Sequence, residues 1–293
     1  MVGVSKRVLM CPPTFFGVHY KINPWMSRSL EEGGGDPVDG NLARIQWINL
    51  VNILQHLDIR IVLLDPVPEL PDLVFTANAG FIYDKTVIVS SFKHKERQLE
   101  EDVFRDFFCS HTTLKTVQLP RFLLPSKGVP KQDVFFEGHG DALFWKDVVF
   151  AGKGMRSNEL GIYEAMRLSG LDIPCVLLEL VDPNFYHLDT CLCPVGNTLL
   201  YYPKAFSTLA QRSIEKEVSR KKGTLISVSE EDAKNFVCNG VPVSENKCWH
   251  LVTAQPSPIL HEQLEEVGIH VWPVAISEFL KAGGGARCLT LFI

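Results

Sequence analysis

Residues 133–153, DVFFEGHGDALFWKDVVFAGK, consist of an apolar run, a small polar turn that holds Glu137, and a second apolar run. The same layout recurs in DLVFTANAGFIYDKTVIVSSF (72–92), NFYHLDTCLCPVGNTLLYYP (184–203) and PVSENKCWHLVTAQP (242–256), and GGGARCLTLFI (283–293) begins the same way and stops. The turn positions taken as equivalent are Asn78, Glu137, Asp189, Asn246 and Cys288. They are 59, 52, 57 and 42 residues apart, and such a regular period indicates a repeat architecture.

The two ends of the chain complement each other in this pattern. The fifth copy lacks its second strand, whereas the chain begins with KRVLMCPP (6–13), an apolar strand with no turn before it. If the N-terminal strand completes the C-terminal unit, the repeats close into a ring and no sheet edge is left unpaired. Closure would also anchor the terminus that carries Cys288.

The segments between the turns have helical patterns followed by short apolar strands. In NLARIQWINLVNILQHL (41–57) the aliphatic side chains are expected largely on one broad face of a helix: Leu42, Ile45, Ile48, Leu50, Ile53, Leu54 and Leu57. The strands after the helices are IRIVLL (59–64), CVLLEL (175–180), TLISV (224–228) and IHVWPV (269–274). Each unit is therefore predicted as strand, strand, helix, strand, and five units around an axis form a five-bladed α/β propeller. An open α/β sheet would also fit the alternation, but the polar turns and the matching ends favour the ring.

Composition indicates one intracellular domain. The 293 residues carry a formal charge of -5 and no linker-like tract divides them, so a single domain spanning residues 1–293 is expected. A pI near 6.0 argues against a nucleic-acid partner, because such proteins usually present a basic face. A small-molecule partner is favoured. With no signal-peptide pattern and no run of about 20 apolar residues, the sequence predicts a soluble, cytoplasmic protein without a membrane partner.

Eight cysteines are scattered along the chain, mostly in apolar surroundings, and most are expected to be reduced, buried thiols. A metal site formed by Cys191, Cys193, Cys248 and His250 is one alternative. The Cys-x-Cys spacing departs from the usual Cys-x2-Cys pattern, so a packed pair of thiols is favoured for Cys191 and Cys193. No metal or organic cofactor is expected.

In a closed ring of repeats, turns at equivalent positions converge near one end of the axis. They would bring six polar side chains into one pocket: Asn78, Glu137, Asp141, His187, Asp189 and Cys288. Taken singly, a histidine after two aromatic residues is more often a satisfied core residue, and acidic residues in turns are usually solvated. The shared repeat position favours a site in which Cys288 attacks as a thiolate and His187 shuttles protons. The excess of carboxylates indicates a cationic ligand, and a planar guanidinium suits forked hydrogen bonds to them.

Five motifs, in this order, resemble those of the guanidino-group-modifying superfamily, also called pentein or amidinotransferase-like enzymes: FTANAG, FEGHGDAL, AGKGMRSNELG, HLDTCL and GGGARCLT. The resemblance covers nearly the whole chain. With MCPPTFFGVHYKINPWM near the N-terminus, FTANAG and FEGHGDAL are most similar to the arginine dihydrolase domain. In known relatives that domain is often followed by a further one, which is not expected in this chain. The resemblance implies a cysteine-dependent hydrolase of linear amidines.

The resemblance also implies a role for each matching position. Cys288 would be the nucleophile and His187 the general acid and base. Glu137 and Asp189 would hold the substrate guanidinium, with Glu137 in the catalytic group. Asp141 would support the substrate-binding side of the site.

Three further positions concern the rest of the substrate. Arg156, in GMRSNELG, stands where relatives bind the substrate α-carboxylate, and Asn23 and Asn78 match asparagines of the dihydrolase group. Deiminases and dimethylargininases usually carry an aspartate where this chain has Asn78. An amide gives up the ion pair to a guanidinium, but its NH2 group donates to a neutral ureido oxygen. Arg287, beside the nucleophile, would lower the thiol pKa, although a surface arginine is an equally good interpretation.

The expected reaction is hydrolysis of L-arginine through a thiouronium intermediate on Cys288, giving ornithine, ammonia and CO2. The alternatives are a dimethylargininase or arginine deiminase that releases citrulline, and a non-catalytic binding protein of the same fold, which the complete set of catalytic residues disfavours. The sequence leaves open the choice between arginine, methylated arginine and agmatine, and the oligomeric state. It also leaves open whether residues 27–40 form a lid over the pocket or an ordinary surface loop.

Overall fold

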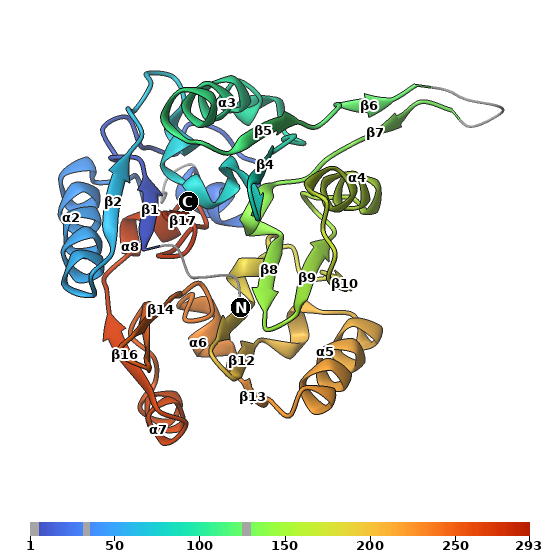
Figure 1. Ribbon diagram of the computed structural model, residues 1–293. Coiled ribbons are helices and arrows are strands. Elements are labelled where there is room, and N and C mark those ends of the chain that lie inside the picture. The colour runs from blue at the N-terminus through green and yellow to red at the C-terminus, as the bar shows by residue number, and fades with distance from the viewer. Residues whose placement is uncertain (1–5, 32–35, 125–129) are drawn as a thin grey trace.

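The computed structural model describes residues 6–31, 36–124 and 130–293. These residues form five three-stranded sheets and one two-stranded hairpin. The sheets follow one another in chain order around the centre of the molecule (Figure 1). Within the described residues each sheet is separate, so the open α/β sheet considered as an alternative is wrong.

Four sheets each come from one continuous segment of chain. The first is β3 (Gly80–Tyr83), β4 (Thr86–Val89) and β5 (Lys115–Gln118), with helix α3 (Glu100–His111). The second is β8 (Ala142–Trp145), β9 (Val148–Lys153) and β10 (Cys175–Glu179), with α4 (Glu159–Ser169). The third is β11 (Leu192–Val195), β12 (Thr198–Tyr201) and β13 (Thr224–Ser227), with α5 (Thr208–Arg220). The fourth is β14 (Val241–Glu245), β15 (Cys248–Thr253) and β16 (Ile269–Pro273), with α7 (Pro258–Glu266).

All four segments connect their strands in the same way. The first two strands form an antiparallel hairpin, and the third strand returns through the helix to pair parallel with the second. This is the expected order of strand, strand, helix and strand. The parallel return needs a crossover connection, because strands that point the same way cannot be joined by a tight turn.

The fifth sheet joins the two ends of the chain. Strand β1 (Arg7–Met10) pairs antiparallel with β17 (Leu291–Phe292) and parallel with β2 (Arg60–Leu63). Helices α1 (Pro24–Ser29) and α2 (Gly40–His56) lie between β1 and β2 in the chain. The expectation that the N-terminal strand completes the C-terminal unit is therefore confirmed.

Polar caps define where the helices of the repeat begin. Asn158, Ser207 and Ser257 precede α4, α5 and α7, and their side-chain oxygens accept a backbone N–H of the first turn. Such a cap contributes about 1 kcal/mol, because it satisfies a helix N–H that has no partner within the helix. The short helices α6 (Glu230–Lys234) and α8 (Ser277–Leu280) lie on either side of the fourth sheet in the chain.

The buried face of α2 differs from the expected one. Its core-facing residues are Ala43, Gln46, Trp47, Leu50 and Leu54, whereas three aliphatic residues of the predicted face are exposed: Leu42, Ile45 and Ile48. A helix buries one stripe at spacings of three and four residues. The small Ala43 and the large Trp47 set that stripe, and the aliphatic residues outside it remain in solvent.

The turn between β14 and β15 corrects the fourth repeat marker. Asn246 and Lys247 both have left-handed backbone angles there, with φ of 49° and 68°, as a two-residue hairpin turn requires. The counterpart of Glu137 and Asp189 is instead Asn239, two residues before β14 begins. The intervals from Glu137 then become 52, 50 and 49 residues, which is more regular than predicted.

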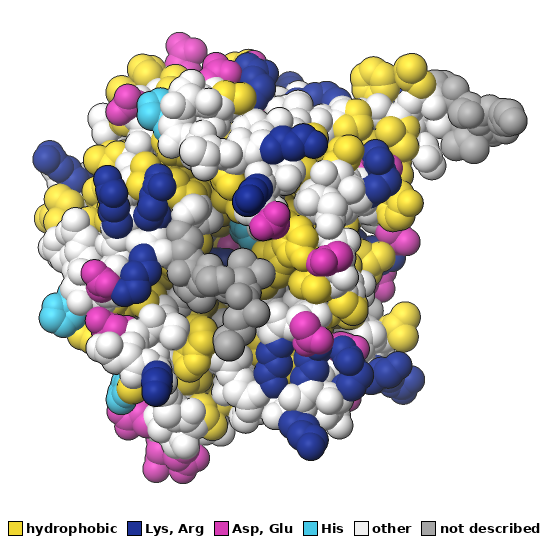
Figure 2. All heavy atoms as spheres, in the orientation of Figure 1, with side chains coloured by type: hydrophobic (Ala, Val, Ile, Leu, Met, Phe, Trp, Pro, Cys, Tyr) yellow, Lys and Arg dark blue, Asp and Glu magenta, His cyan; other side chains and the backbone are white. Residues whose placement is uncertain are grey.

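The hairpin of β6 (Phe122–Leu123) and β7 (Gln132–Asp133) extends away from the rest of the chain (Figure 1). It carries exposed hydrophobic side chains, including Leu124 at 76% exposure, and Figure 2 shows hydrophobic surface along it. Over most of the face in Figure 2, basic and acidic side chains are interspersed. No helix within the described parts of the chain has the length and apolar character needed to cross a bilayer.

Candidate active site

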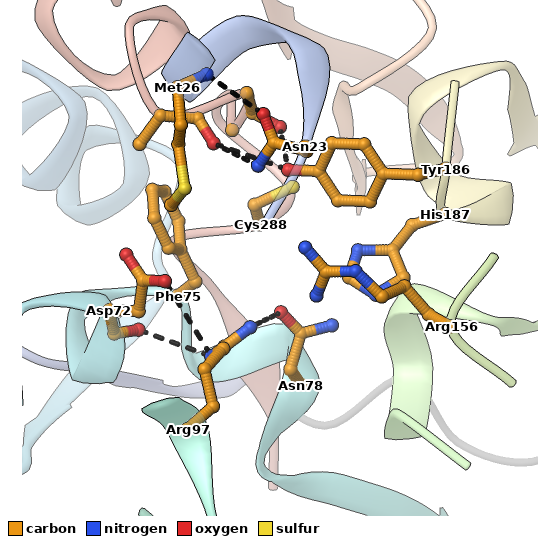
Figure 3. Close-up of a pocket in the computed structure, with 13 residues that line it drawn as sticks. Asn23, Met26, Asp72, Phe75, Asn78, Arg97, Arg156, Tyr186, His187 and Cys288 are labelled. Atoms are coloured by element: carbon orange, nitrogen blue, oxygen red, sulfur yellow. Dashed lines mark hydrogen bonds and ion pairs between the residues drawn. The ribbon is translucent and has the colours of Figure 1, made fainter. Parts of the chain in front are cut away.

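The pocket lies where the turns before the first strands of the repeats meet. Short 3-10 turns at Thr76–Ala79, Gly138–Gly140 and Leu188–Thr190 lead into β3, β8 and β11, and neighbouring turns contact one another. Gly140 permits this contact, because a Cβ there would lie 2.3 Å from Asn78 Nδ2. The pocket shown in Figure 3 is lined by Asn23, Met26, Asp72, Phe75, Asn78, Arg97, Arg156, Tyr186, His187, Ala282, Gly283, Gly284 and Cys288.

Cys288 is buried in the wall of this pocket, with 3% exposure. Its Sγ lies 3.1 Å from Asn239 Nδ2 and 3.5 Å from Asp189 Oδ2, and its backbone N–H donates to Asn239 Oδ1 at 3.1 Å. Burial raises the thiol pKa well above 9, and the Asp189 carboxylate acts in the same direction. The thiol is therefore neutral in this environment.

The glycine run before Cys288 has a specific backbone function. Gly283 has φ of +80°, and a Cβ there would lie 2.7 Å from the Tyr186 hydroxyl oxygen. Other residues seldom adopt this conformation. The Tyr186 hydroxyl donates to the carbonyl oxygen of Gly283 at 2.7 Å, which ties the loop before Cys288 to the turn that carries His187.

Glu137 and His187 form a short hydrogen bond at the centre of the site. His187 Nε2 lies 2.7 Å from Glu137 Oε2. Burial by itself would raise the Glu137 pKa, but Arg156 and His187 lower it below the ordinary value, so the carboxylate is ionised. Burial lowers the pKa of His187 to about 4, although Glu137 opposes this. A neutral imidazole that donates from Nε2 to a carboxylate keeps the lone pair on Nδ1, which can accept a proton.

Arg156 pairs with the carboxylate that was predicted to hold the substrate. Its Nη1 lies 2.9 Å from Glu137 Oε2, and its Cζ lies 4.5 Å from the centre of the Tyr186 ring. Figure 3 shows the guanidinium pointing into the pocket beside His187. With this side chain in place, the cavity has a volume of about 10 Å³. A ligand the size of arginine can enter only if the lining moves.

A second buried network supports Asn78, and sequence reasoning missed it. Arg97 donates to Asn78 Oδ1 at 2.9 Å and to the carbonyl oxygen of Asp72 at 3.2 Å, and it forms an ion pair with Glu100 at 2.7 Å. Asp72 in turn accepts from the Tyr20 hydroxyl at 2.8 Å. Arg97 and Glu100 belong to the polar run 93–101, which has the composition of a solvated segment. The sequence contains no signal of their burial.

Asn239 is the other residue that the sequence interpretation missed. Its amide contacts both the thiol and the backbone of Cys288, and also the carbonyl oxygen of Asp189 at 3.0 Å. A signal was present, because the dipeptide Asn239–Gly240 directly precedes the apolar residues of β14 at the spacing of the other turns.

The remaining predicted site residues lie around the pocket. Asn23 is in its wall, where Nδ2 donates to the carbonyl oxygen of Ala282 at 3.0 Å and Oδ1 caps α1. Asp141 lies behind the lining rather than in it, accepting from the Ser157 hydroxyl at 2.5 Å and from the Leu188 N–H at 3.1 Å. Burial raises the Asp141 pKa well above its ordinary value.

Arg287 is partly buried beside Cys288 rather than free on the surface. Burial lowers its pKa, while Asp189 and the two nearby thiols Cys193 and Cys288 oppose the shift. The Asp189 pKa is raised to about 7 by burial, against the opposing charge of Arg287. Arg287 thus stabilises the ionised form of Asp189, whereas the pKa of the Cys288 thiol stays high.

Two further expectations concern the surroundings of the site. Cys191 and Cys193 are packed in the core whereas Cys248 is exposed, which favours the packed thiols over a shared site. The described residues contain no group of three or more side chains suited to a metal ion. Of the suggested lid, residues 32–35 lie outside the described residues. Beyond them, Lys281 pairs with Asp36 at 3.0 Å.

The fold and the arrangement of a thiol, an imidazole and buried carboxylates define a class, the guanidino-group-modifying proteins with the α/β pentein fold. A family model described as N,N dimethylarginine dimethylhydrolase, eukaryotic, matches residues 34–293, and the chain belongs to this family. It is 41% identical over 288 residues to the bifunctional arginine dihydrolase/ornithine cyclodeaminase ArgZ of Synechocystis sp., covering 97% of this chain and 37% of that protein. The chain thus spans less than half the length of this relative.

Two other similar chains are closer to this one in length. The N(G),N(G)-dimethylarginine dimethylaminohydrolase of Mycobacterium tuberculosis is 36% identical over 290 residues, which cover 99% of this chain and 86% of that protein. The crystal structure of the N-terminal domain of ArgZ, a mutant bound to substrate, has a TM-score of 0.85 at 40% identity and covers 97% of both chains.

Proposed function

We propose that this protein is an arginine dihydrolase, which converts L-arginine and two waters to ornithine, two ammonia molecules and CO2. The observation that carries the proposal is the placement of the Asn78 amide in one pocket with Cys288 and His187. The similarity to ArgZ supports the substrate and the reaction class. No step of the proposed reaction needs a metal or an organic cofactor.

Substrate binding begins with an exchange of guanidinium groups. The substrate guanidinium replaces that of Arg156 at Glu137 and lies between Glu137 and Asp189, and the released Arg156 binds the α-carboxylate. The new positive charge beside Cys288 lowers the thiol pKa, because an adjacent cation favours the thiolate. His187 accepts the thiol proton.

The first hydrolysis removes one nitrogen. The Cys288 thiolate attacks the guanidinium carbon, and His187 returns the proton to the nitrogen that leaves as ammonia. This gives a planar thiouronium bonded to sulfur. Water, deprotonated by His187, attacks the same carbon, and the carbon–sulfur bond breaks to give citrulline.

The second hydrolysis depends on keeping citrulline in the pocket. Nδ2 of Asn78 donates to the ureido oxygen, while Asn23 closes the opposite wall. Cys288 attacks the ureido carbon and a second ammonia leaves, forming a thiocarbamate. Water then releases an N-carboxy-ornithine, which loses CO2 to give ornithine.

We also infer that the five sheets are the blades of a five-bladed α/β propeller. All five have the same strand order, with an antiparallel first pair and a parallel second pair. The β1–β17 pairing joins the last unit to the first. This arrangement explains why turns from distant segments meet at one pocket.

Product analysis tests the proposed function. The purified protein is incubated with L-arginine, and ornithine is separated from citrulline; ornithine is expected, and Cys288→Ala should form neither product. The second candidate is a dimethylargininase, which the family model and the mycobacterial relative favour. Rapid citrulline formation from dimethylarginine, with no ornithine from arginine, would establish that function instead.

A further inference from the structure

Glu100 lies at the start of α3 and has no exposed surface. Both of its carboxylate oxygens accept from Arg97, Oε1 from Nε at 2.9 Å and Oε2 from Nη2 at 2.7 Å. Arg97 is among the residues that line the pocket, and Glu100 lies behind it. A two-bond pair of this kind fixes the plane of the guanidinium as well as its position.

The fixed guanidinium determines how the Asn78 amide is oriented. Arg97 Nη1 donates to Asn78 Oδ1 at 2.9 Å, and Asn78 Nδ2 donates to the backbone carbonyl oxygen of Glu137 at 3.2 Å. A guanidinium can only donate and a carbonyl oxygen can only accept, so the reversed amide is excluded. Nδ2 carries a second hydrogen, and Figure 3 shows Nδ2 on the side of Asn78 away from Arg97.

We propose that Glu100 is a positioning residue that, through Arg97, holds the Asn78 amide with its NH2 group toward the ligand and so sets the preference of the pocket for a ureido group over a guanidinium. This inference rests on the proposed function, in which citrulline is the intermediate. A ureido oxygen accepts a hydrogen bond from Nδ2, whereas a guanidinium has no acceptor to offer. Once Arg97 is no longer held, Asn78 Oδ1 loses its donor, and only the 3.2 Å bond from Nδ2 to the Glu137 carbonyl oxygen keeps the amide in place, so its NH2 group is aimed less firmly at the ligand.

Few other contacts fix the plane of the Arg97 guanidinium. Its Cζ lies 4.5 Å from the centre of the Phe92 ring, and its Nε lies 3.9 Å from Asp72 Oδ2. The ring restrains the guanidinium from above but does not fix its rotation. The Asp72 side chain is beyond hydrogen-bond distance, and the Asp72 carbonyl oxygen accepts only one bond, from Nη2 at 3.2 Å, so Glu100 supplies the only two-bond restraint that the described residues show.

Glu101 offers a matched control on the same helix. It is 7% exposed, pairs with Arg121 through Oε2 at 2.8 Å, and accepts the Phe92 N–H with Oε1 at 2.7 Å. Substitution by glutamine at position 100 or 101 therefore removes a largely buried negative charge that has an arginine partner. Only the change at position 100 alters a hydrogen-bond partner of the arginine that holds Asn78.

The test measures affinities for both ligands in the full chain with Cys288→Ser, so that neither ligand is consumed. L-arginine and L-citrulline are titrated by calorimetry. Adding Glu100→Gln should weaken citrulline binding about tenfold relative to arginine, as expected for one misdirected hydrogen bond. Adding Glu101→Gln should leave the ratio of the two affinities within about twofold. An unchanged ratio in Glu100→Gln would overturn the proposal.

A variant that fails to fold must be distinguished from a folded variant in which the Asn78 amide is no longer held in position. Thermal unfolding identifies folded variants, and Arg97→Lys serves if Glu100→Gln does not fold, because a lysine keeps the charge but lacks the fork. The same shift against citrulline is expected, and an unchanged ratio in Arg97→Lys would again overturn the proposal.

Turnover by the protein with an active thiol separates this inference from the proposed function. If the wild type makes only citrulline, the proposed function fails, while the affinity ratio still decides the role of Glu100. If the wild type makes ornithine, Glu100→Gln should release about tenfold more citrulline per ornithine formed. A wild-type product ratio in that variant would contradict the inference alone.

Discussion

The guanidinium of Arg156 lies against Glu137, with Nη1 2.9 Å from Oε2, in the position proposed for the substrate guanidinium. The side chain is not fully satisfied there, because its Nε is buried without a hydrogen-bond partner among the described residues. Such an unpaired donor weakens the resting arrangement. The protein therefore holds its own arginine side chain where the proposed function places the substrate guanidinium.

Arg156→Ala should have opposite effects on binding of the substrate carboxylate and on binding of a guanidinium group. Loss of the carboxylate partner should raise the KM for L-arginine about a hundredfold. Methylguanidinium has no carboxylate and no longer competes with the side chain, so it should inhibit several-fold more strongly than in the wild type. Inhibition constants check this, with Arg167→Ala as control, since Arg167 pairs with Glu164 on the outer side of α4. Weaker inhibition by methylguanidinium would contradict the exchange.

Asn78→Asp should convert the product from ornithine toward citrulline. A carboxylate accepts from a guanidinium but cannot donate to the ureido oxygen, so citrulline should leave before the second attack. The loss of one hydrogen bond predicts roughly a tenfold rise in citrulline released per ornithine. The two products are quantified by chromatography over the same time course. Unchanged ornithine with no citrulline would contradict the role of the amide.

Asn239→Ala should reduce both activity and stability. It removes the donor to the Cys288 thiol and the acceptor for the Cys288 N–H, which are buried groups. Loss of these bonds should lower the free energy of unfolding by about 2 kcal/mol and lower kcat. Asn246→Gly is the control, because glycine adopts the left-handed conformation of that hairpin turn without strain. Equal effects of the two changes on kcat would refute the corrected repeat position.

Asp189→Asn should change how stability depends on pH. The folded protein raises the Asp189 pKa to about 7 from the ordinary 3.8, so between these values the folded chain holds a proton that the unfolded chain has lost. The stability contributed by this group is therefore present below about 4 and lost as pH rises to about 7. The variant lacks that loss and should gain roughly 4 kcal/mol on the wild type across this range.

Urea unfolding at about pH 5 and about pH 8 measures this difference between the two proteins. His187 titrates in both proteins, so its own contribution largely cancels in the comparison. A difference in unfolding free energy that stays the same at both pH values would show that Asp189 is ionised throughout.

The spacing of the motifs predicted the residues of the site better than it predicted which face of a helix is buried. His187 and Cys288 could be assigned to one pocket because each lies at a turn before an apolar strand, and Glu137, at the same kind of turn, lies against His187. The exposed Ile45 and the buried Gln46 of α2 could not be assigned in this way. Which stripe of a helix is buried depends on the shape of the surface beneath it, and several nearly equivalent stripes existed in the sequence.

By itself the sequence determined the repeating strand, turn and strand units, the pairing of the two chain ends, and the residue types needed for attack on a cationic carbon. These follow from local periodicity and from the chemistry of single side chains. Only the tertiary structure decided that Asn239 rather than Asn246 contacts the thiol, that Arg156 pairs with Glu137, and that Glu100 holds Arg97. Burial and charge pairing arise between distant segments, so the same charged residue can be solvated in one fold and central to the site in another.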